Sequence, residues 1–259
     1  MNITTKKDRL KWFFVYILLV IAAFAVLISI PNISPIRVSA HSGDVFGSAC
    51  GMATIDGNVG SVEWSNASTR TFQMVSPGGA PPFTVTLHIM NSGYYLYMGI
   101  TINDDEFSKI GDYLPQGDAF IINFDNNHSG SLYQMDNAVL ALSAGFPQFE
   151  DRYVYNLSGS NMADINGGGT ADGVGATSRV NNLNHFEVKH PLCSGDSLDF
   201  CLHPSDIVGF RLRYLDAEAN GSFGSAQYYP GSSETSEADI MIGTCSVSDI
   251  FVYLPLIQK

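Results

Sequence analysis

Basic side chains are scarce in this chain of 259 residues, which has 13 Lys and Arg against 25 Asp and Glu. Five of the basic residues and one of the acidic residues lie within positions 1–40, so positions 41–259 hold 8 basic and 24 acidic side chains, a formal charge of −16. Such a surface repels phosphate backbones and anionic lipid headgroups. The charge balance therefore excludes a nucleic-acid-binding protein.

Motifs for several kinds of chemistry are also missing. The sequence contains no CxxC pair, no CxxCH haem-attachment site, no G-x-S-x-G, no H-E-x-x-H and no phosphate-binding loop. These absences remove the common zinc sites, covalently attached haem and the best-known hydrolase motifs from consideration. The content of 45% hydrophobic and 12% aromatic residues nevertheless excludes wholesale disorder and predicts a globular protein with a sizeable core.

Residues 1–40 predict export. Met1–Lys11 is basic, residues 12–30 carry no charge, and the small-residue triplet 38–40 follows Pro31. This order is typical of a secretory signal that is cleaved after Ala40. The uncharged run is also long enough to span a bilayer, so an uncleaved anchor helix with its basic end in the cytoplasm is the alternative. Either interpretation places residues 41–259 at the cell surface or in the secreted fraction.

All four cysteines lie in the exported part, where an even number favours disulfides. Three pairings are open. We favour Cys193 with Cys201, which bracket a short loop, and Cys50 with Cys245, which lie near the two ends of the exported region. Chain entropy gives roughly 2.5 kcal/mol for the short loop and roughly 5 kcal/mol for the long one.

Alternation of apolar and polar residues dominates positions 41–259 and predicts strands. No segment shows a sustained helical period. Asn91-Ser92-Gly93 reads as a hairpin turn between two of the strands. The fold class is all-β, an antiparallel, jelly-roll-like β-sandwich. The strands are expected at Thr69–Val75, Phe83–Ile89, Leu96–Ile102, Ala119–Phe124, Ala138–Leu142, Tyr153–Asn156, His185–Val188, Val208–Tyr214, Ala238–Ile242 and Ile250–Leu254.

Residues 158–184 are rich in Gly and Asn and poor in apolar residues, which predicts a long surface loop. The glycines at 167–169, 173 and 175 do not indicate a dinucleotide site, because no strand leads in and no helix follows. No repeat or linker divides residues 41–259, so we expect a single domain there. Its short apolar tail after Cys245 is either a last edge strand or a sorting tail.

The most specific local pattern is a calcium-binding loop. Counted from Asp125, oxygen-bearing side chains occupy positions 1, 3 and 5, Gly130 stands at position 6 and a carboxylate at position 12. This is the ligand spacing of an EF-hand loop, here flanked by predicted strands instead of helices. An Asx-rich turn that binds nothing is the alternative. The predicted ligands are Asp125, Asn127, Ser129, Ser131 through its carbonyl, Tyr133 through a water or its carbonyl, and Asp136.

The order of several motifs resembles that of family 9 carbohydrate-binding modules and their DOMON-like relatives. The motifs are Thr54-Ile-Asp-Gly57 with Glu63-Trp64, Tyr95–Asp105, Gly117–Asp125, and the later segments Phe186–Leu192 and Asp206–Phe210. The resemblance spans roughly residues 52–243. It implies a sugar-binding β-sandwich, often with structural calcium, that has no catalytic activity.

The sequence departs from that pattern in its aromatic residues. Trp64 is the only tryptophan after the signal, and its place in the motif favours core packing over sugar stacking. Tyrosine rings can replace tryptophan as flat platforms. The predicted ligand-binding residues are the pairs Tyr94/Tyr95 and Tyr228/Tyr229, with at most one residue of each pair facing a given groove because strand neighbours point to opposite faces.

The sequence thus predicts an extracellular, non-catalytic domain that binds a polysaccharide or glycan and is stabilised by Ca²⁺. Three alternatives stay open. One is a calcium-stabilised surface or envelope domain that binds protein. Another is a DOMON-like haem module with axial ligands among His88, Met90 and Met98. The third is a glycoside hydrolase that uses two carboxylates, drawn from Asp104, Asp105, Glu106, Asp196 and Asp199.

Overall fold

The computed structural model describes residues 41–246, except 61, 110–116, 129–137, 146, 157–159, 219–221, 223, 225 and 232–235. The chain divides into two compact units, Met1–Val38 and Ser39–Lys259, and every described residue belongs to the second. The predicted signal or anchor, the predicted strand Ile250–Leu254 and most of the C-terminal tail lie outside the described residues. Within the described part, no helix has the length and apolar character needed to cross a membrane.

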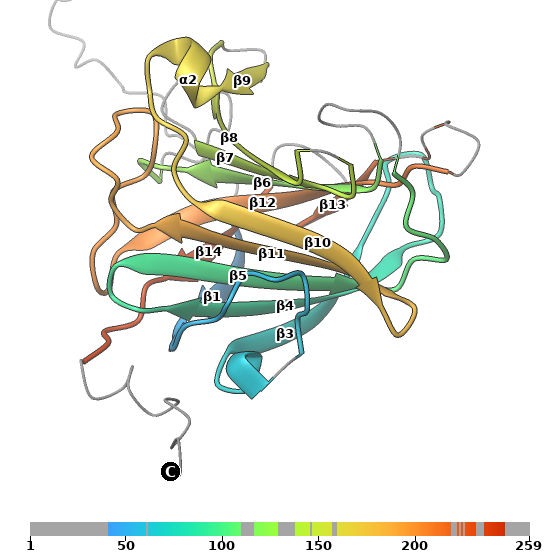
Figure 1. Ribbon diagram of the computed structural model, residues 1–259, viewed down its shortest axis with the longest axis horizontal. Coiled ribbons are helices and arrows are strands. Elements are labelled where there is room, and N and C mark those ends of the chain that lie inside the picture. Colours follow the sequence, from blue (N-terminus) through green and yellow to red (C-terminus); the bar gives the residue numbers. More distant parts are fainter. Residues whose placement is uncertain are drawn as a thin grey trace, which may run out of the picture. The chain divides into compact units, whose positions relative to one another are not determined.

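Two β-sheets make up the domain (Figure 1). The first has the order β1 (His41–Gly47), β14 (Glu237–Met241), β12 (Ile207–Leu215), β6 (Ala119–Asp125), β7 (Ala138–Ser143), β8 (Phe149–Val154) and β9 (Asn161–Ala163), with β13 (Gln227–Tyr229) paired to β12. The second has the order β10 (Val174–Val180), β11 (Leu183–Pro191), β5 (Tyr95–Ile102), β4 (Phe83–Asn91) and β2 (Ala49–Cys50), with β3 (Ser68–Met74) paired to β4.

The predicted antiparallel β-sandwich is confirmed. Two edge pairs differ from it, because β1 runs parallel to β14 and β2 runs parallel to β4. The predicted hairpin turn joins β4 to β5, and the Asn91 side chain accepts a hydrogen bond from the Gly93 backbone N–H at 3.0 Å. Helical structure in the described residues is limited to the 3-10 turn η1 (Val62–Trp64) and the single-turn α2 (Asp164–Gly167).

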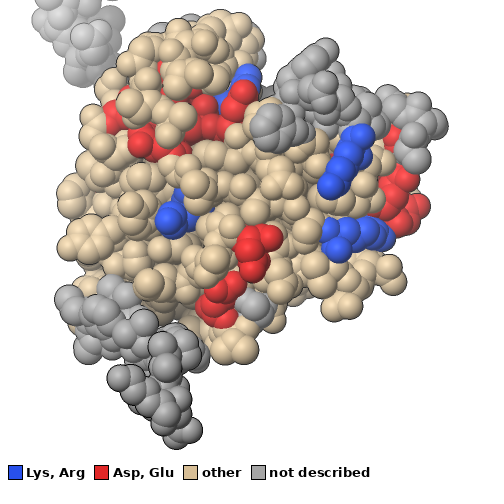
Figure 2. Space-filling model, viewed as in Figure 1, with Lys and Arg blue, Asp and Glu red and all other residues tan. Residues whose placement is uncertain are grey.

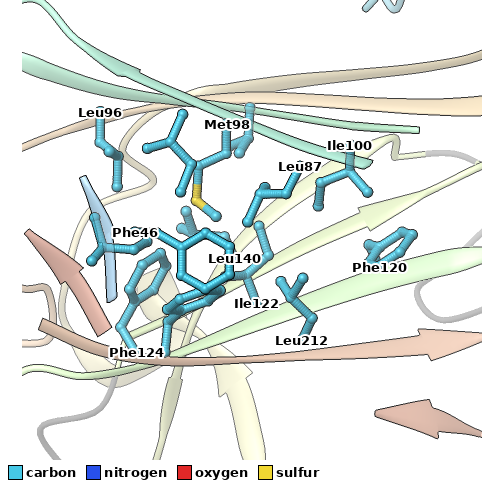
Figure 3. Close-up of a cluster of buried hydrophobic side chains, with 14 of the residues drawn as sticks. Phe46, Leu87, Leu96, Met98, Ile100, Phe120, Ile122, Phe124, Leu140 and Leu212 are labelled. Atoms are coloured by element: carbon cyan, nitrogen blue, oxygen red, sulfur yellow. The ribbon is translucent and has the colours of Figure 1, made fainter. Parts of the chain in front are cut away.

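The alternating side chains of the strands build a core between the sheets (Figure 3). From the second sheet, Leu87, Met98 and Ile100 point inward, and each is 0% exposed. They meet Phe120 and Ile122 of β6, which are equally buried. Because period two places every second residue on one face, the sequence pattern alone identifies this inward-facing set.

A second, smaller apolar cluster lies on the outer face of β4 and β5. Trp64 is 2% exposed and packs with Val59, Met90 and Tyr97, so the expectation that it packs in a core is confirmed. The cluster needs Gly99, because a Cβ at this position would lie only 3.1 Å from the Trp64 ring. Residues 53–67 are thereby held against the sheet.

One buried carboxylate explains why the Ile-Asp-Gly and Trp motifs occur together. Glu187 of β11 is 0% exposed. Its Oε2 accepts the backbone N–H groups of Asp56 at 2.9 Å, Gly57 at 2.6 Å and Asn58 at 3.2 Å. Its Oε1 accepts the indole N–H of Trp64 at 2.6 Å. A single side chain therefore fixes the segment that covers the outer face.

The expectation of one long loop over residues 158–184 is wrong. This stretch contains β9, α2 and the seven-residue strand β10, which pairs with β11 along its whole length. β10 lies at the edge of its sheet, so few of its side chains need to be apolar. Gly175 is required there because a Cβ would collide with Leu142 and Phe149. Of the glycines that suggested a loop, Gly167, Gly169, Gly173 and Gly175 allow close packing, whereas Gly168 ends α2 with a positive φ of 91°.

Both favoured disulfides are present. Cys50 pairs with Cys245 across a sequence separation of 195 residues, and Cys193 pairs with Cys201 across 8. The first joins β2 to the segment after β14, and the second closes the loop that follows β11. None of the four cysteines is free.

Candidate functional site

The predicted calcium loop is described only at its beginning. Asp125 ends β6 and is 0% exposed, whereas Asn127 is exposed. Burial and the neighbouring charge of Asp125 raise the pKa of the Glu237 carboxyl to about 8, although Arg211 lowers it. Asp125 therefore stands in a buried acidic setting at a strand end. The other predicted ligands, Ser129, Ser131, Tyr133 and Asp136, lie outside the described residues.

The two predicted tyrosine pairs have different surroundings. Tyr94 is 79% exposed and Tyr95 is 38% exposed. The ammonium group of Lys189 lies 4.8 Å from the centre of the Tyr95 ring, and Tyr97 contacts that ring edge-on at 6.4 Å. This pair forms an accessible aromatic surface where β5 begins.

Tyr228 and Tyr229 are 8% exposed each, and neither offers an open platform. The Tyr229 ring stacks on Phe72 at 3.9 Å and its hydroxyl donates to Asp44 at 2.9 Å. Tyr228 forms a backbone bridge with Val75. Since both faces of β13 are covered, the expectation of an exposed ring in this pair does not fit the structure.

The haem candidates do not converge. Met98 points into the core between the sheets, whereas Met90 belongs to the cluster on the outer face with Trp64. His88 shares that outer face: its ring contacts Trp64, and its Nδ1 lies 3.0 Å from the Thr69 hydroxyl. Axial ligands stand on opposite sides of an iron, and none of these pairs can do so without rebuilding the sheet.

The acids nominated for hydrolysis fall into two groups. Asp104, with Asp105 and Glu106, follows the end of β5, which pairs with the start of β11. Asp196 and Asp199 follow the end of β11. Nine residues of strand span about 27 Å, so the two groups lie at opposite ends of the sheet. This separation is far larger than the roughly 5–10 Å between glycosidase carboxylates. No acid of one group can therefore act with an acid of the other.

Of the nominated acids at the end of β5, Asp104 meets two acids that were not nominated, Asp118 and Asp216. One carboxylate oxygen of each of the three lies within 4.8 Å of the others. Burial raises the pKa of the Asp118 carboxyl to about 7, although the backbone N–H groups of Ala217 and Ser108 lower it. Burial and the nearby Asp104 raise the pKa of Asp216 to about 6. These groups could hold a metal ion.

The loop that carries Asp104 is held by side chains of the second sheet. The guanidinium of Arg179 donates to the carbonyls of Asp104 at 3.0 Å, Asp105 at 2.9 Å and Glu106 at 2.6 Å. Asn184 also donates to the Glu106 carbonyl at 2.6 Å. The acidic side chains at this end are therefore displayed on a rigid backbone.

A cleft of about 540 Å³ opens beside this loop. Its apolar lining residues include Pro81, Pro82 and the half-buried Phe83. Its polar lining residues include Asn103, Asp105, Asp216 and Glu218. All four of these polar residues keep some exposure to solvent. The cleft can therefore pack an apolar surface and form hydrogen bonds to the same ligand.

The second acidic group contains Asp151, Asp164, Asp196 and Asp199 with His190. Figure 2 shows acidic side chains gathered beside α2 and β9, and others at the opposite side of this view. A third convergence, of Asp56, Glu63 and Glu187, is explained by the four donors that surround Glu187. Sequence reasoning missed Asp118, Asp151, Asp164, His190 and Asp216. Of these residues, Asp118 and His190 stood in motifs that we had singled out, Gly117–Asp125 and Phe186–Leu192.

No family model matches the sequence, and no curated protein matches it. Solved structures share the fold. A family 9 carbohydrate-binding module from Caldicellulosiruptor kristjanssonii in complex with cellotriose is 14% identical, has a TM-score of 0.56, and covers 82% of this chain and 99% of its own. The same organism's module in complex with glucose is 15% identical, with a TM-score of 0.56 and coverages of 79% and 98%.

A third structure, from Bacteroides uniformis ATCC 8492, is itself only a proposed carbohydrate-binding protein. It is 7% identical, has a TM-score of 0.55, and covers 78% of this chain and 100% of its own. The chain thus has the fold of family 9 carbohydrate-binding modules, as the motifs predicted.

Proposed function

We propose that this chain is an extracellular, non-catalytic carbohydrate-binding domain that is stabilised by calcium. The observation that carries the proposal is the cleft beside Asp104, in a fold shared with modules that were solved in complex with cellotriose and with glucose. The two disulfides and the predicted export signal support an extracellular location.

The cleft suits a sugar because a pyranose ring has an apolar C–H face and a rim of hydroxyl groups. Phe83 and the two prolines at 81 and 82 offer an apolar surface for the C–H face. Asp105 and Asp216 offer carboxylate oxygens that accept hydrogen bonds from the hydroxyls. The acidic surface of the domain does not oppose an uncharged glycan, whereas it does oppose phosphorylated ligands.

The exposed pair Tyr94/Tyr95 remains the alternative platform. It lies at the start of β5, whereas the cleft lies past its end. Eight residues of strand cover about 26 Å, so one short oligosaccharide cannot touch both surfaces. Variants at the two places therefore test two separate locations for the same activity.

For sugar binding, we expect affinity electrophoresis in calcium to show retardation by at least one glucan. The double variant D105N/D216N is expected to weaken binding about thirtyfold, because replacing a charged acceptor by a neutral amide oxygen costs about 1 kcal/mol per hydrogen bond, or about 2 kcal/mol for the two. The exposed carboxylate of Asp206 provides a matched control, D206N. The double variant Tyr94→Ala/Tyr95→Ala is expected to bind like the wild type.

If the tyrosine variant alone loses binding, the activity stands and its location moves to the start of β5. If the wild type is retarded by no glycan in a panel of plant and microbial polysaccharides, carbohydrate binding is wrong. The protein-interaction alternative then takes its place.

For the predicted loop from Asp125 to Asp136, we expect 5 mM calcium to stabilise chelated protein by about 1 to 2 kcal/mol, given an affinity of about 0.1 to 1 mM. Asp125→Ala should lower the calcium-dependent gain in stability by this amount. The variant also changes a buried carboxylate, so the measured quantity is the difference in Tm with and without calcium, not the Tm itself. The control D206N should show the same rise in Tm with calcium as the wild type. An Asp125→Ala protein with that same rise would rule out calcium binding by the loop.

A further inference from the structure

The second acidic group brings together side chains from three places in the chain. Asp151 comes from β8, and Asp164 is the first residue of α2. Asp196 and Asp199 come from the loop closed by the Cys193–Cys201 disulfide. Their carboxylates meet beside the ring of His190 in β11. We call this set of five residues the disulfide-loop acidic centre.

The centre consists of two overlapping triads that share Asp199. In one triad, ligand atoms of Asp151, His190 and Asp199 lie within 4.8 Å of one another, and in the other the same holds for Asp164, Asp196 and Asp199. Asp164 and His190 are 0% exposed, Asp151 is 3% exposed and Asp199 is 6% exposed. Three carboxylates, those of Asp151, Asp164 and Asp199, are thus buried together, and the partly exposed Asp196 lies beside them.

The protein satisfies only part of these carboxylates. Asp151 Oδ2 accepts the backbone N–H of Asp172 at 2.8 Å. Asp199 Oδ2 accepts the hydroxyl of Ser194 at 2.7 Å. Four buried oxygens of the centre have no hydrogen-bond partner: Asp151 Oδ1, Asp164 Oδ1, Asp164 Oδ2 and Asp199 Oδ1. Asp164 in particular has neither oxygen paired. Leaving a buried charged group unpaired is among the costliest features of a fold.

The ring of His190 is the basic group of the centre. Its Nε2 lies 3.3 Å from Asp151 Oδ2 and 3.6 Å from Asp199 Oδ2. Its Nδ1 lies 2.8 Å from the Pro191 carbonyl oxygen. The ring faces the oxygens of Asp151 and Asp199 that already accept hydrogen bonds, and even its protonated form offsets only one of the negative charges of the centre.

Protonation is the other way to remove the excess charge. Burial, together with the charges of Asp151 and Asp199, raises the pKa of Asp164 to about 8, and burial raises the pKa of Asp199 to about 6. A protonated Asp164 would still have to donate its hydrogen, yet neither of its oxygens has a partner. Protonation alone therefore exchanges an unpaired acceptor for an unpaired donor.

We infer that the disulfide-loop acidic centre binds a divalent cation through the unpaired oxygens of Asp151, Asp164 and Asp199. Carboxylate oxygens are hard ligands, and four of them in one place favour calcium, which takes six to eight oxygens at flexible positions. Asp196 adjoins this set, but its own oxygens accept hydrogen bonds from the backbone N–H groups of Leu198 and Thr170. The ion would connect β8, α2 and the disulfide loop.

This inference deepens the proposed stabilisation by calcium and names a second site for it, independent of the loop from Asp125 to Asp136. It does not depend on any sugar ligand. Its test has to separate the two sites, because both would respond to the same ion.

Calcium titration of the chelated full chain by isothermal calorimetry tests the centre. We expect Asp164→Asn, which keeps the shape of the side chain and removes its charge, to remove one bound calcium or to weaken it at least tenfold. Asp125→Ala should leave this calcium in place. The matched control D206N should bind as the wild type does.

Thermal unfolding gives a second readout that a purely structural role of Asp164 would not produce. Without calcium and at pH 9, where the Asp164 carboxyl with its pKa of about 8 is ionised, Asp164→Asn is expected to raise Tm, because it relieves repulsion among buried carboxylates. On addition of calcium, the Tm of the wild type should rise above that of the variant, because the variant gains less. A Tm difference between variant and wild type that is positive without calcium and negative with calcium is the signature of a cation site.

Equal stoichiometry and affinity in Asp164→Asn and wild type would overturn the inference. Loss of all calcium binding in Asp125→Ala would also overturn it, while the predicted loop would stand. Loss of all binding in Asp164→Asn would instead support the centre and contradict the loop. Tighter binding of Zn²⁺ than of Ca²⁺ would overturn the assignment of an oxygen-preferring ion.

Discussion

Replacing Cys50 and Cys245 together by serine is expected to lower the free energy of unfolding by about 5 kcal/mol. The reason is the length of chain that this bond closes, 195 residues, because a cross-link removes more conformations from the unfolded chain when its loop is longer. Urea unfolding of the oxidised wild type and of the double variant measures the loss, taken from the extrapolated free energies.

The matched comparison is the second disulfide. The bond between Cys193 and Cys201 closes a sequence separation of only 8 residues. Replacing both cysteines by serine should therefore lower the free energy of unfolding by about 2.5 kcal/mol. Both variants are measured in chelator, so that a cation bound beside the Cys193–Cys201 loop does not contribute. Losses that are equal, or a larger loss for the short loop, would show that loop length does not govern the effect of these bonds.

Replacing Glu187 by alanine is expected to cost about 4 kcal/mol. The substitution leaves the backbone N–H groups of Asp56, Gly57 and Asn58 and the indole N–H of Trp64 without their acceptor. A buried donor that loses its partner costs about 1 to 3 kcal/mol, and water can replace some of the four bonds once the segment loosens. Urea unfolding of the wild type and of Glu187→Ala at pH 7 measures this loss in the free energy of unfolding.

The control for Glu187 is Glu63, which is half-buried in the same region and accepts the backbone N–H of Thr54 at 3.0 Å. Glu63→Ala is expected to cost about 1 kcal/mol. Because the segment around Trp64 covers β4 and β5, Glu187→Ala should also change the fluorescence of Trp64 below the unfolding transition. A variant that matches Glu63→Ala in stability would contradict the anchoring role of Glu187.

The alternation of side chains was sufficient to predict the main strands. β4, β5, β6 and β12 lie within two residues of their predicted bounds, because their inner faces are continuously apolar and period two is a local property. The cysteine pairing was also predicted, since only one arrangement matched a short loop with a closure between the chain ends. The place of Trp64 in its motif correctly predicted a packed residue.

The alternation pattern did not predict the edge strand β10 or the short strand β13. β10 contains only a few apolar residues and was taken for a loop, because an edge strand obtains its order from hydrogen bonds to β11, not from burying its own side chains. β13 is three residues long, too short for any period to appear. Its neighbours Phe72 and Val75 determine that Tyr228 and Tyr229 are buried, and no local pattern could have distinguished them from the exposed Tyr94 and Tyr95.

The sequence by itself determined the all-β class and the motifs shared with family 9 modules, because each depends on local alternation or local spacing. It also favoured, among three open pairings, the two disulfides that the structure contains. Only the tertiary structure decided which carboxylates meet. Asp151, Asp164 and Asp199 are separated by up to 48 positions, and the acids that looked clustered in the sequence, Asp104 and Asp105, point to different surroundings. Strand pairing brings distant residues together, and a sequence pattern of period two carries no information about which distant strands will pair.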